Sequence, residues 1–193
     1  MSRKPAHQGQ VRIIGGAWRS RVVRFPELPD LRPTSDRVRE TLFNWLGQDL
    51  TGKTCLDLFA GSGALGFEAL SRNAKSVVMV DTVAAVRAAL TRNAADMQAG
   101  AGLGDRLTIV RDDALQFLRT CGPVFDVIFC DPPFREEWFT RLWPGLQAAL
   151  APGGVLYAES GRMLEPPPSW QAIKSGRAGQ VFYQLMMRAD NHG

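Results

Sequence analysis

From residue 53 onward the sequence alternates between short apolar runs and longer segments with a helical pattern. Because strands that alternate with helices build a parallel sheet covered by helices, the sequence predicts an α/β, doubly wound, Rossmann-like fold. Two further strand-like stretches, 170–174 and 180–188, are joined by a short turn at 176–179 and predict an antiparallel hairpin at one edge. The expected strands of the alternating region are 54–59, 76–80, 107–110, 125–130 and 155–159.

The segment in front of this region has a different pattern. Two short apolar runs, 11–14 and 18–23, flank a glycine pair and predict two strands with a glycine-containing connection. Three prolines then mark an extended linker, and Ser35 or Thr34 can cap a helix that runs to about Leu46. We therefore divide the 193 residues into a mobile basic tail at 1–10, a β-hairpin with linker and helix at 11–48, and a Rossmann-like domain at 49–193.

Positive charge is concentrated in the first 39 residues. They hold nine Arg or Lys against three acids, whereas the remaining 154 residues hold 14 basic and 16 acidic side chains. Arginine supplies 19 of the 23 basic residues, and its planar guanidinium suits phosphate contacts and stacking on bases. A basic segment beside a nearly neutral domain favours an anionic macromolecular partner. Charge alone fits a solvated basic tail equally well.

Cysteine usage and hydropathy exclude several other classes of protein. The three cysteines (Cys55, Cys121 and Cys130) stand among hydrophobic residues without C-x-x-C spacing, so we expect buried reduced thiols and no metal site. No apolar run approaches the roughly 18 residues that a membrane helix needs. Polar residues, not a signal-peptide core, follow the basic N-terminus. We expect a cytoplasmic protein with no membrane association.

A glycine-rich turn follows the first strand of the alternating region. Gly61-Ser62-Gly63-Ala64-Leu65-Gly66 fits G-x-G-x-x-G between a strand and a helix, and Asp81 stands where a ribose-binding acid is expected. The glycines let the backbone turn sharply and approach a ligand, and the carboxylate can accept hydrogen bonds from ribose hydroxyls. By itself the pattern serves a nicotinamide dinucleotide as well as S-adenosylmethionine.

Further acids stand at the ends of the expected strands. Asp57 lies two residues inside the first strand, Asp112 and Asp113 follow the third, and Asp131 follows the fourth. In open α/β sheets ligands bind beyond the carboxyl ends of the strands, so these acids belong to one rim. Asp57 can face the cationic amino-acid end of S-adenosylmethionine, whereas the negative charges of a pyrophosphate would repel its carboxylate. Asp112 or Asp113 can accept a hydrogen bond from adenine, while the other acid caps the next helix.

Asp131-Pro132-Pro133-Phe134 is the most specific motif in the chain. Two prolines fix the backbone and offer carbonyls without competing N–H donors. An exocyclic amine on a base is a poor nucleophile, because its lone pair is delocalised into the ring. Hydrogen bonds from its two N–H groups to the Asp131 carboxylate and the Pro132 carbonyl would shift that lone pair toward a methyl donor, and Phe134 can stack on the base. The motif predicts methylation of an amine.

At this point the sequence resembles a known family. The four residues are similar to the (Asn/Asp)-Pro-Pro-(Tyr/Phe) motif of amino-group methyltransferases. Three longer stretches resemble the RsmD-like bacterial enzymes that methylate N2 of a guanine in small-subunit ribosomal RNA, and the likeness runs from about residue 11 to 188. These stretches are Arg12-Ile13-Ile14-Gly15-Gly16, the segment from Arg32-Pro33-Thr34-Ser35-Asp36-Arg37 to Leu46, and Leu56-Asp57-Leu58-Phe59-Ala60-Gly61-Ser62-Gly63.

The resemblance implies a class I S-adenosylmethionine-dependent methyltransferase with an N-terminal β-hairpin, acting as a monomer on 16S ribosomal RNA within a 30S assembly particle. By match of motif, Asp131, Pro132, Pro133 and Phe134 would hold the guanine. The cofactor residues would be Asp57, Phe59, Gly61, Ser62, Gly63, Asp81, Thr82, Asp112, Asp113 and Ala114. The chain has Asp81 where the family pattern has Glu, and Asp112-Asp113-Ala114 where it has Asn-Asp-Ala, which leaves open which acid meets adenine.

The N-terminal arm then gains a role in binding RNA. Its residues combine guanidinium groups for phosphates with an aromatic ring for an unstacked base. The expected RNA contacts are Arg12, Trp18, Arg19, Arg21, Arg24 and Arg37. Thr34, Arg37 and Arg39 close over the site in one interpretation; in the other, Arg37 and Arg39 only pair with Glu40 and Asp36.

Other functions remain open on the sequence alone. A nicotinamide-dependent oxidoreductase explains the glycine turn and Asp81, but it leaves Asp57, the Asp-Pro-Pro-Phe segment and the basic arm unexplained. A non-catalytic RNA-binding protein explains the arm alone. Among methyltransferases, the four-residue motif also permits DNA adenine, DNA cytosine or protein glutamine as the substrate.

Overall fold

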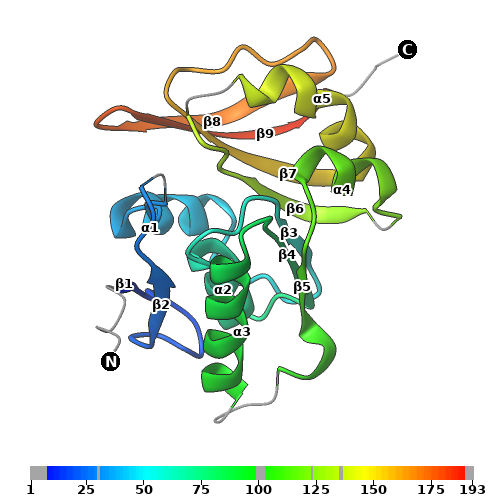
Figure 1. The fold of residues 1–193 in the computed structure, drawn as a ribbon. Coiled ribbons are helices and arrows are strands. Elements are labelled where there is room, and N and C mark those ends of the chain that lie inside the picture. The colour runs from blue at the N-terminus through cyan, green and yellow to red at the C-terminus, as the bar shows by residue number, and fades with distance from the viewer. Residues whose placement is uncertain (1–7, 30, 99–102, 123, 135–136, 190–193) are drawn as a thin grey trace.

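The computed structural model describes residues 8–29, 31–98, 103–122, 124–134 and 137–189. Within these residues a seven-stranded sheet has the order β5-β4-β3-β6-β7-β9-β8 (Figure 1). The strands from β3 to β7 are parallel, and β9 runs antiparallel to both β7 and β8, which confirms the predicted fold class and the edge hairpin. The strands are β3 (Thr54–Asp57), β4 (Ser76–Val80), β5 (Leu107–Val110), β6 (Phe125–Cys130), β7 (Leu150–Ser160), β8 (Trp170–Ala178) and β9 (Val181–Arg188).

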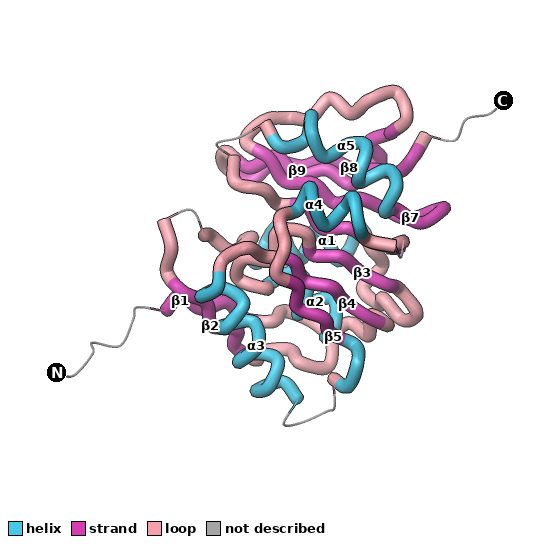
Figure 2. The backbone as a smooth tube through the Cα atoms, turned by 45° about the vertical axis from the view of Figure 1, so that its right-hand side comes forward, coloured by secondary structure: helices cyan, strands magenta, loops and turns pink. Residues whose placement is uncertain are grey.

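Helices cover both faces of this sheet, whose strands run side by side across the molecule (Figure 2). Successive strand residues point to opposite faces, so Cys55 and Phe129 join one buried cluster while Leu56 and Ile128 join the other. Burial on both faces explains why the strands read as continuous apolar runs. The first cluster includes side chains of α1 (Asp36–Trp45), α2 (Ala64–Ser71) and α3 (Ala84–Gln98). The second cluster includes side chains of α4 (Ala114–Thr120) and α5 (Trp138–Ala149). A short 3-10 helix, η1 (Gly104–Arg106), precedes β5.

The N-terminal hairpin forms a separate two-stranded antiparallel sheet beside α3. It consists of β1 (Gln8–Arg12) and β2 (Val22–Pro26), and the side chain of Asn93 on α3 bonds both the N–H and the carbonyl of Arg24. Val23 and Phe25 are buried in the same cluster as α2 and α3, so the hairpin packs onto the sheet domain. The expected strand boundaries were wrong: residues 8–10, assigned to the tail, belong to β1. Residues 1–7 lie outside the described part of the chain.

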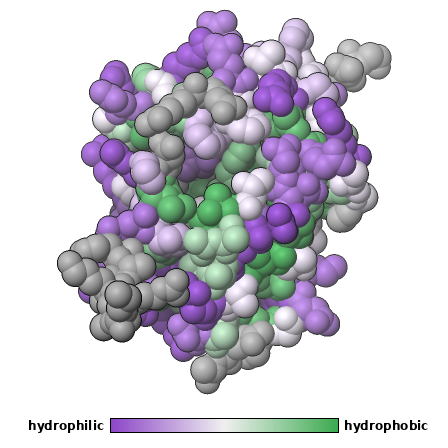
Figure 3. All heavy atoms as spheres, viewed as in Figure 1, coloured by the Kyte–Doolittle hydropathy of each residue, from purple (hydrophilic) through white to green (hydrophobic). Residues whose placement is uncertain are grey.

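The helix after the linker begins where the sequence predicts. Ser35 is its N-cap, with the side-chain oxygen accepting the Val38 N–H at 3.4 Å, and Val38 and Leu42 are buried. Figure 3, in the orientation of Figure 1, shows apolar side chains gathered near the middle of this face and hydrophilic ones around them. None of the described helices combines the length and the apolar character needed to cross a membrane.

Candidate functional site

The strand order creates a switch point between β3 and β6. From β3 the chain adds β4 and β5 on one side, then returns to place β6 on the other side of β3. The loops that leave the carboxyl ends of β3 and β6 therefore diverge, and in open α/β sheets this is where ligands bind. Asp57 ends β3, and Asp131 directly follows β6. The two most informative acids of the sequence thus lie at the carboxyl ends of the two strands that flank this switch point, and we call the region between their loops the crevice.

The glycine turn after β3 has the backbone that its sequence predicts. Gly61 and Gly63 have φ of 49° and 78°, which favour glycine. A Cβ at Gly66 would come within 2.4 Å of Met79 and 3.2 Å of an Asp57 oxygen, so close packing also requires glycine at this position. A Cβ at Gly61 would meet Leu31 and the Phe59 carbonyl at 3.8 Å, which is ordinary van der Waals contact, so its positive φ rather than crowding favours glycine there. The turn is thus a tight, glycine-dependent connection between β3 and α2.

Asp57 is a buried carboxylate beneath this turn. It is 3% exposed, and its Oδ2 accepts the Gly66 N–H at 3.0 Å. Burial raises the pKa of Asp57 to about 7, the Gly66 hydrogen bond opposes that shift, and the charges of Asp81 and Glu159 add to it. No described Lys or Arg forms an ion pair with Asp57. A group of this kind gains stability from a cationic partner.

Asp81 holds the turn from the end of β4. Its Oδ2 accepts the Gly61 N–H at 3.0 Å and its Oδ1 accepts the Val83 N–H at 2.8 Å. A carboxylate has about four acceptor positions, so two remain for ligand hydroxyls. Thr82 follows on the same rim. The position predicted for a ribose-binding acid is therefore next to the glycine turn.

The structure distinguishes the two acids after β5. Asp113 is exposed and caps α4, with its Oδ1 accepting the N–H groups of Leu115 and Gln116. Asp112 is half-buried and, among the described residues, accepts a hydrogen bond from the N–H of Asp113 alone. Because capping occupies Asp113, Asp112 is the acid with more acceptor capacity for a ligand. Ala114 is buried at the start of α4.

Asp131 and the residues after it form the opposite side of the crevice. Asp131 is half-buried and Pro132 is buried, whereas Pro133 and Phe134 are exposed, Phe134 by 47%. Burial, together with the charges of Glu159 and Asp57, raises the pKa of Asp131 well above its ordinary value. A methyl group added at Gly161 would lie 3.8 Å from Phe134 Cβ, so the exposed ring lies beside the end of β7.

Glu159 is a site residue that the sequence interpretation missed. Cys130 and Ala158 are the last pair of the β6–β7 ladder, and Asp131 and Glu159 directly follow them on the two neighbouring chains of the sheet. Glu159 is 3% exposed, and its Oε1 accepts hydrogen bonds from Thr34 Oγ1 and Tyr157 Oη, each at 2.8 Å. Its position could have been found by extending the search for strand-end acids to the fifth strand.

The residues predicted to contact RNA differ in their exposure to solvent. Arg12, Arg19, Arg24 and Arg37 are exposed. Arg21 is half-buried and donates to the Met97 carbonyl at 3.1 Å, so it partly anchors the hairpin to α3. Trp18 is 5% exposed, and its backbone N–H donates to Ser71 Oγ. The expectation that its ring stacks on a base was wrong, because the ring belongs to the buried core under the hairpin.

A buried ionic network joins the N-terminal segment to the sheet domain. Glu68 on α2 is fully buried and accepts the backbone N–H groups of Ile14 and Gly15 at 2.9 and 2.8 Å. The same carboxylate pairs with Arg39 at 3.1 Å and Arg72 at 2.9 Å. Arg39 also pairs with Asp36 and is fully buried, so it does not close over the site. This network positions the hairpin and α1.

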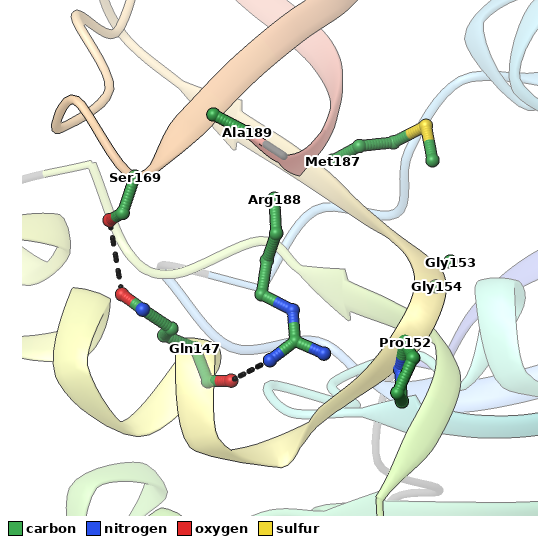
Figure 4. A pocket seen from close by; sticks show the side chains of 8 residues that line it. All are labelled: Gln147, Pro152, Gly153, Gly154, Ser169, Met187, Arg188 and Ala189. Carbon is green, nitrogen blue, oxygen red and sulfur yellow. Dashed lines mark hydrogen bonds between the residues drawn. The ribbon is translucent and has the colours of Figure 1, made fainter. Parts of the chain in front are cut away.

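A separate hollow lies at the opposite end of the sheet. Gln147 of α5, residues 152–154 of β7 and Arg188 of β9 line it, and the Arg188 guanidinium approaches the Gln147 carbonyl at 3.5 Å (Figure 4). Strand β7 begins beside this hollow, whereas the acids of the crevice lie where strands end.

Among the described residues, no three His, Cys, Asp or Glu side chains come together as a metal site.

Comparison with known proteins decides between the open interpretations. The sequence family described as Conserved hypothetical protein 95, the RsmD family, matches residues 11–187. The chain belongs to this family. The RsmD family consists of S-adenosylmethionine-dependent methyltransferases, so S-adenosylmethionine is the cofactor and a nicotinamide-dependent oxidoreductase is excluded.

Named relatives agree over nearly the full length. A protein from Escherichia coli K12 named Ribosomal RNA small subunit methyltransferase D is 42% identical, covering 96% of this chain and 95% of that one. A protein of the same name from Haemophilus influenzae is 38% identical and covers 94% of this chain and 95% of that one. The solved structure of the Escherichia coli protein yhhF has a TM-score of 0.80 at 42% identity, covering 93% of this chain and 98% of that one.

The residues of the crevice fit the cofactor of the RsmD family. Asp57 lacks a described cationic partner, and the cofactor carries an ammonium group. Asp81 keeps free acceptor positions beside bare glycine backbone, where ribose hydroxyls need them. Acceptors for the ammonium group and the ribose hydroxyls of S-adenosylmethionine are thus present on one side of the crevice, with Asp131 and Phe134 on the other.

Proposed function

We propose that this protein transfers the methyl group of S-adenosylmethionine to N2 of a guanine in small-subunit ribosomal RNA. The observation that carries the proposal is the position of Asp131 at the carboxyl end of β6, beside the switch point, with Pro132 buried and Phe134 exposed. The relatives named Ribosomal RNA small subunit methyltransferase D support the choice of RNA.

Asp131 and Pro132 orient the amine. The Asp131 carboxylate accepts one N–H and the Pro132 carbonyl accepts the other, which draws the nitrogen lone pair out of the ring and directs it along the line of attack. Phe134 stacks on the face of a base that has left its helix or was already unpaired. Positioning supplies most of the rate increase for an in-line displacement of this kind.

The other acids hold the cofactor, which supplies a methyl group on a positively charged sulfur. Asp57 binds its ammonium group, and Asp81 with the backbone around Gly61 and Thr82 binds the ribose. Asp112 accepts the adenine amino group, since Asp113 is committed to capping α4. The proposed cofactor site also includes Phe59, Ser62, Gly63 and Ala114.

The proton that N2 releases after methyl transfer goes to Asp131 or to water. Burial and the neighbouring charges of Glu159 and Asp57 raise the pKa of Asp131, and a raised pKa makes a carboxylate a better base near neutral pH. The N–H groups of the bound guanine and the positive charge of S-adenosylmethionine both favour the ionised form of Asp131 and Asp57. Binding of the two substrates therefore offsets part of the cost of burying these carboxylates.

Exposed arginines of the N-terminal segment hold the RNA backbone. Arg12, Arg19, Arg24 and Arg37 extend from the hairpin and the start of α1. We extend the proposal to a monomer that acts in the cytoplasm on a 30S assembly particle.

Analysis of ribosomal RNA from a strain that lacks the gene tests this function. Nucleosides from small-subunit RNA are digested and measured by mass spectrometry, and the modified position is mapped by sequencing fragments. We expect the loss of one N2-methylguanosine and its return when the gene is restored. An unchanged content of N2-methylguanosine, or the loss of a methyl group on another base, contradicts the proposal.

A further inference from the structure

Glu159 occupies a place that the reaction described so far does not use. It stands beside Asp131 across the β6–β7 ladder, and two residues beyond it Gly161 lies against Phe134. A base stacked on Phe134 therefore has the ends of both strands at its edge. Burying a carboxylate is costly, and Glu159 has no ion-pair partner among the described residues. A purely structural role would be served by a neutral side chain.

The hydrogen bonds of Glu159 leave one oxygen uncommitted. Thr34 and Tyr157 both donate to Oε1, and Oε2 accepts no hydrogen bond from a described residue. Burial raises the pKa of Glu159, while the two hydroxyl donors oppose that shift and favour the ionised form. The two hydroxyls also hold the carboxylate in one orientation. Glu159 is thus a fixed acceptor with a free oxygen beside the amine-binding group.

The four RNA bases differ in the N–H groups beside their amines. Guanine has a ring N–H at N1 next to its N2 amine, giving three neighbouring donors on one edge. Adenine and cytosine have a ring nitrogen with a lone pair next to the amine, and uracil has no amine. Asp131 and Pro132 supply two acceptors for an amine, so a third acceptor distinguishes guanine from the others.

We propose that Glu159 accepts the N1–H of the target base and thereby selects guanine. The inference deepens the proposed function and rests on it, since Asp131 and Pro132 must hold the N2 amine at the same time. A carboxylate oxygen facing the N1 lone pair of adenine, or N3 of cytosine, is repelled and leaves a buried charge unpaired. Glu159 is a specificity-determining residue, and Thr34 and Tyr157 are positioning residues for it.

A change of one base and one side chain tests this directly. The mapped guanine is replaced by 2-aminopurine in a ligated RNA, which keeps the C2 amine but presents a lone pair at N1, and the RNA is assembled into small subunits. Initial rates of methyl transfer are measured for wild type and Glu159→Gln. The glutamine keeps an oxygen for Thr34 and Tyr157, and its amide N–H can donate to the N1 of 2-aminopurine. Glu165→Gln, at an exposed position, is the matched control.

We expect wild type and Glu165→Gln to prefer guanine over 2-aminopurine by about 10- to 100-fold, the range for leaving one buried polar group unpaired. Glu159→Gln should lose that preference or reverse it, with an unchanged affinity for S-adenosylhomocysteine at pH 8, where Asp57 is ionised in both proteins, and an unfolding temperature no lower than that of wild type. Equal losses on both substrates would assign Glu159 a structural role and overturn the inference. If wild type fails on guanine itself, the proposed function fails instead.

Discussion

Buried carboxylates occur in two regions of this molecule, and their surroundings differ. Glu68 accepts two backbone N–H groups and pairs with two arginines, so its charge is matched; we call these residues the Glu68 network. The second region holds Asp57, the half-buried Asp131 and Glu159, which we call the strand-end acids. The charge of Glu159 raises the pKa of both aspartates, the charge of Asp57 also raises the pKa of Asp131, and no described Lys or Arg pairs with the three acids. One region is complete as folded, and the other retains acceptor capacity.

The difference separates a structural role from a functional one. A buried ion pair whose partners are all present costs little to keep but much to break. Carboxylates grouped without cations oppose folding at neutral pH, and groups arranged in this way are concentrated at functional sites. Changes in the Glu68 network should therefore reduce stability, while changes in the strand-end acids should reduce ligand binding and turnover.

The largest expected effect is on stability, from Glu68→Gln. The substitution leaves Arg39 and Arg72 buried without their shared carboxylate, and breaking a buried pair costs about 3 to 5 kcal/mol of unfolding free energy. Urea unfolding followed by circular dichroism measures it, with Glu40→Gln on the exposed side of α1 as the control. A loss below about 1 kcal/mol, the range of a surface ion pair, would mean that the network does not hold the hairpin in place.

Asp57 should show the opposite behaviour, with a pH dependence whose sign follows from its raised pKa. The folded protein keeps a proton on Asp57 up to about pH 7, whereas the unfolded chain releases it near the ordinary aspartate pKa of 3.8. Rising pH between these values therefore destabilises the folded state without ligand, by up to about 4 kcal/mol.

Asp57→Asn should remove this pH dependence and reduce binding of S-adenosylhomocysteine. Only the ionised carboxylate holds an ammonium group, so wild-type affinity should rise as pH increases through 7. Thermal unfolding and calorimetric titration at pH 5, 6, 7 and 8 measure both effects. Parallel stability curves for the two proteins, or an affinity independent of pH, would show that Asp57 does not act as this acceptor.

A smaller effect is expected at Phe134, which tests the exposed side of the crevice. Stacking of a base on an aromatic ring contributes about 1 to 3 kcal/mol by alanine substitution, so Phe134→Ala should reduce kcat/KM for the particle about 5- to 100-fold. Cofactor affinity and unfolding free energy should stay unchanged, because the ring is 47% exposed. Val124→Ala, at another exposed apolar residue, is the control. Equal activity in the two variants would remove stacking from the account.

The smallest effect is expected for a single phosphate contact. Arg24→Ala should weaken RNA binding at low salt and reduce the slope of log Kd against log salt by about one. Arg119→Ala, on α4 away from the hairpin, should leave the slope unchanged. Filter binding between 50 and 300 mM salt compares them. The same slope for Arg24→Ala and wild type would place the RNA elsewhere.

Much of the fold could be predicted because the sheet is buried on both faces. Continuous apolar runs gave β4, β5 and β6 with their observed bounds. Strand β7 begins at Leu150, five residues before the expected start, since a shift of register between Phe125 and Val127 accommodates the Pro152-Gly153-Gly154 segment within the strand. Proline and glycine mark turns in sequence, and tertiary pairing overrode that signal.

The parts of the site that escaped prediction depend on contacts between distant segments. Glu159 ends the fifth expected strand, but its role follows from its position beside Asp131 and from the hydrogen bond of Thr34, 125 residues away in sequence. Trp18 was assigned to the surface because basic and apolar residues mix around it, and the pattern does not say which side faces the core. The sequence left open which of Asp112 and Asp113 contacts adenine, and only the capping geometry shows that Asp113 is committed to α4.

The central claim is that the strand-end acids form the methyl-transfer site. The direct test is the initial rate of transfer from labelled S-adenosylmethionine to small subunits of the deletion strain, measured for wild type and Asp131→Asn at saturating cofactor. We predict that wild type transfers one methyl group per particle and that the initial rate of Asp131→Asn is lower by at least about 100-fold. The affinity for S-adenosylhomocysteine and the unfolding free energy should be comparable for the two proteins. Equal rates for the two proteins would contradict the account.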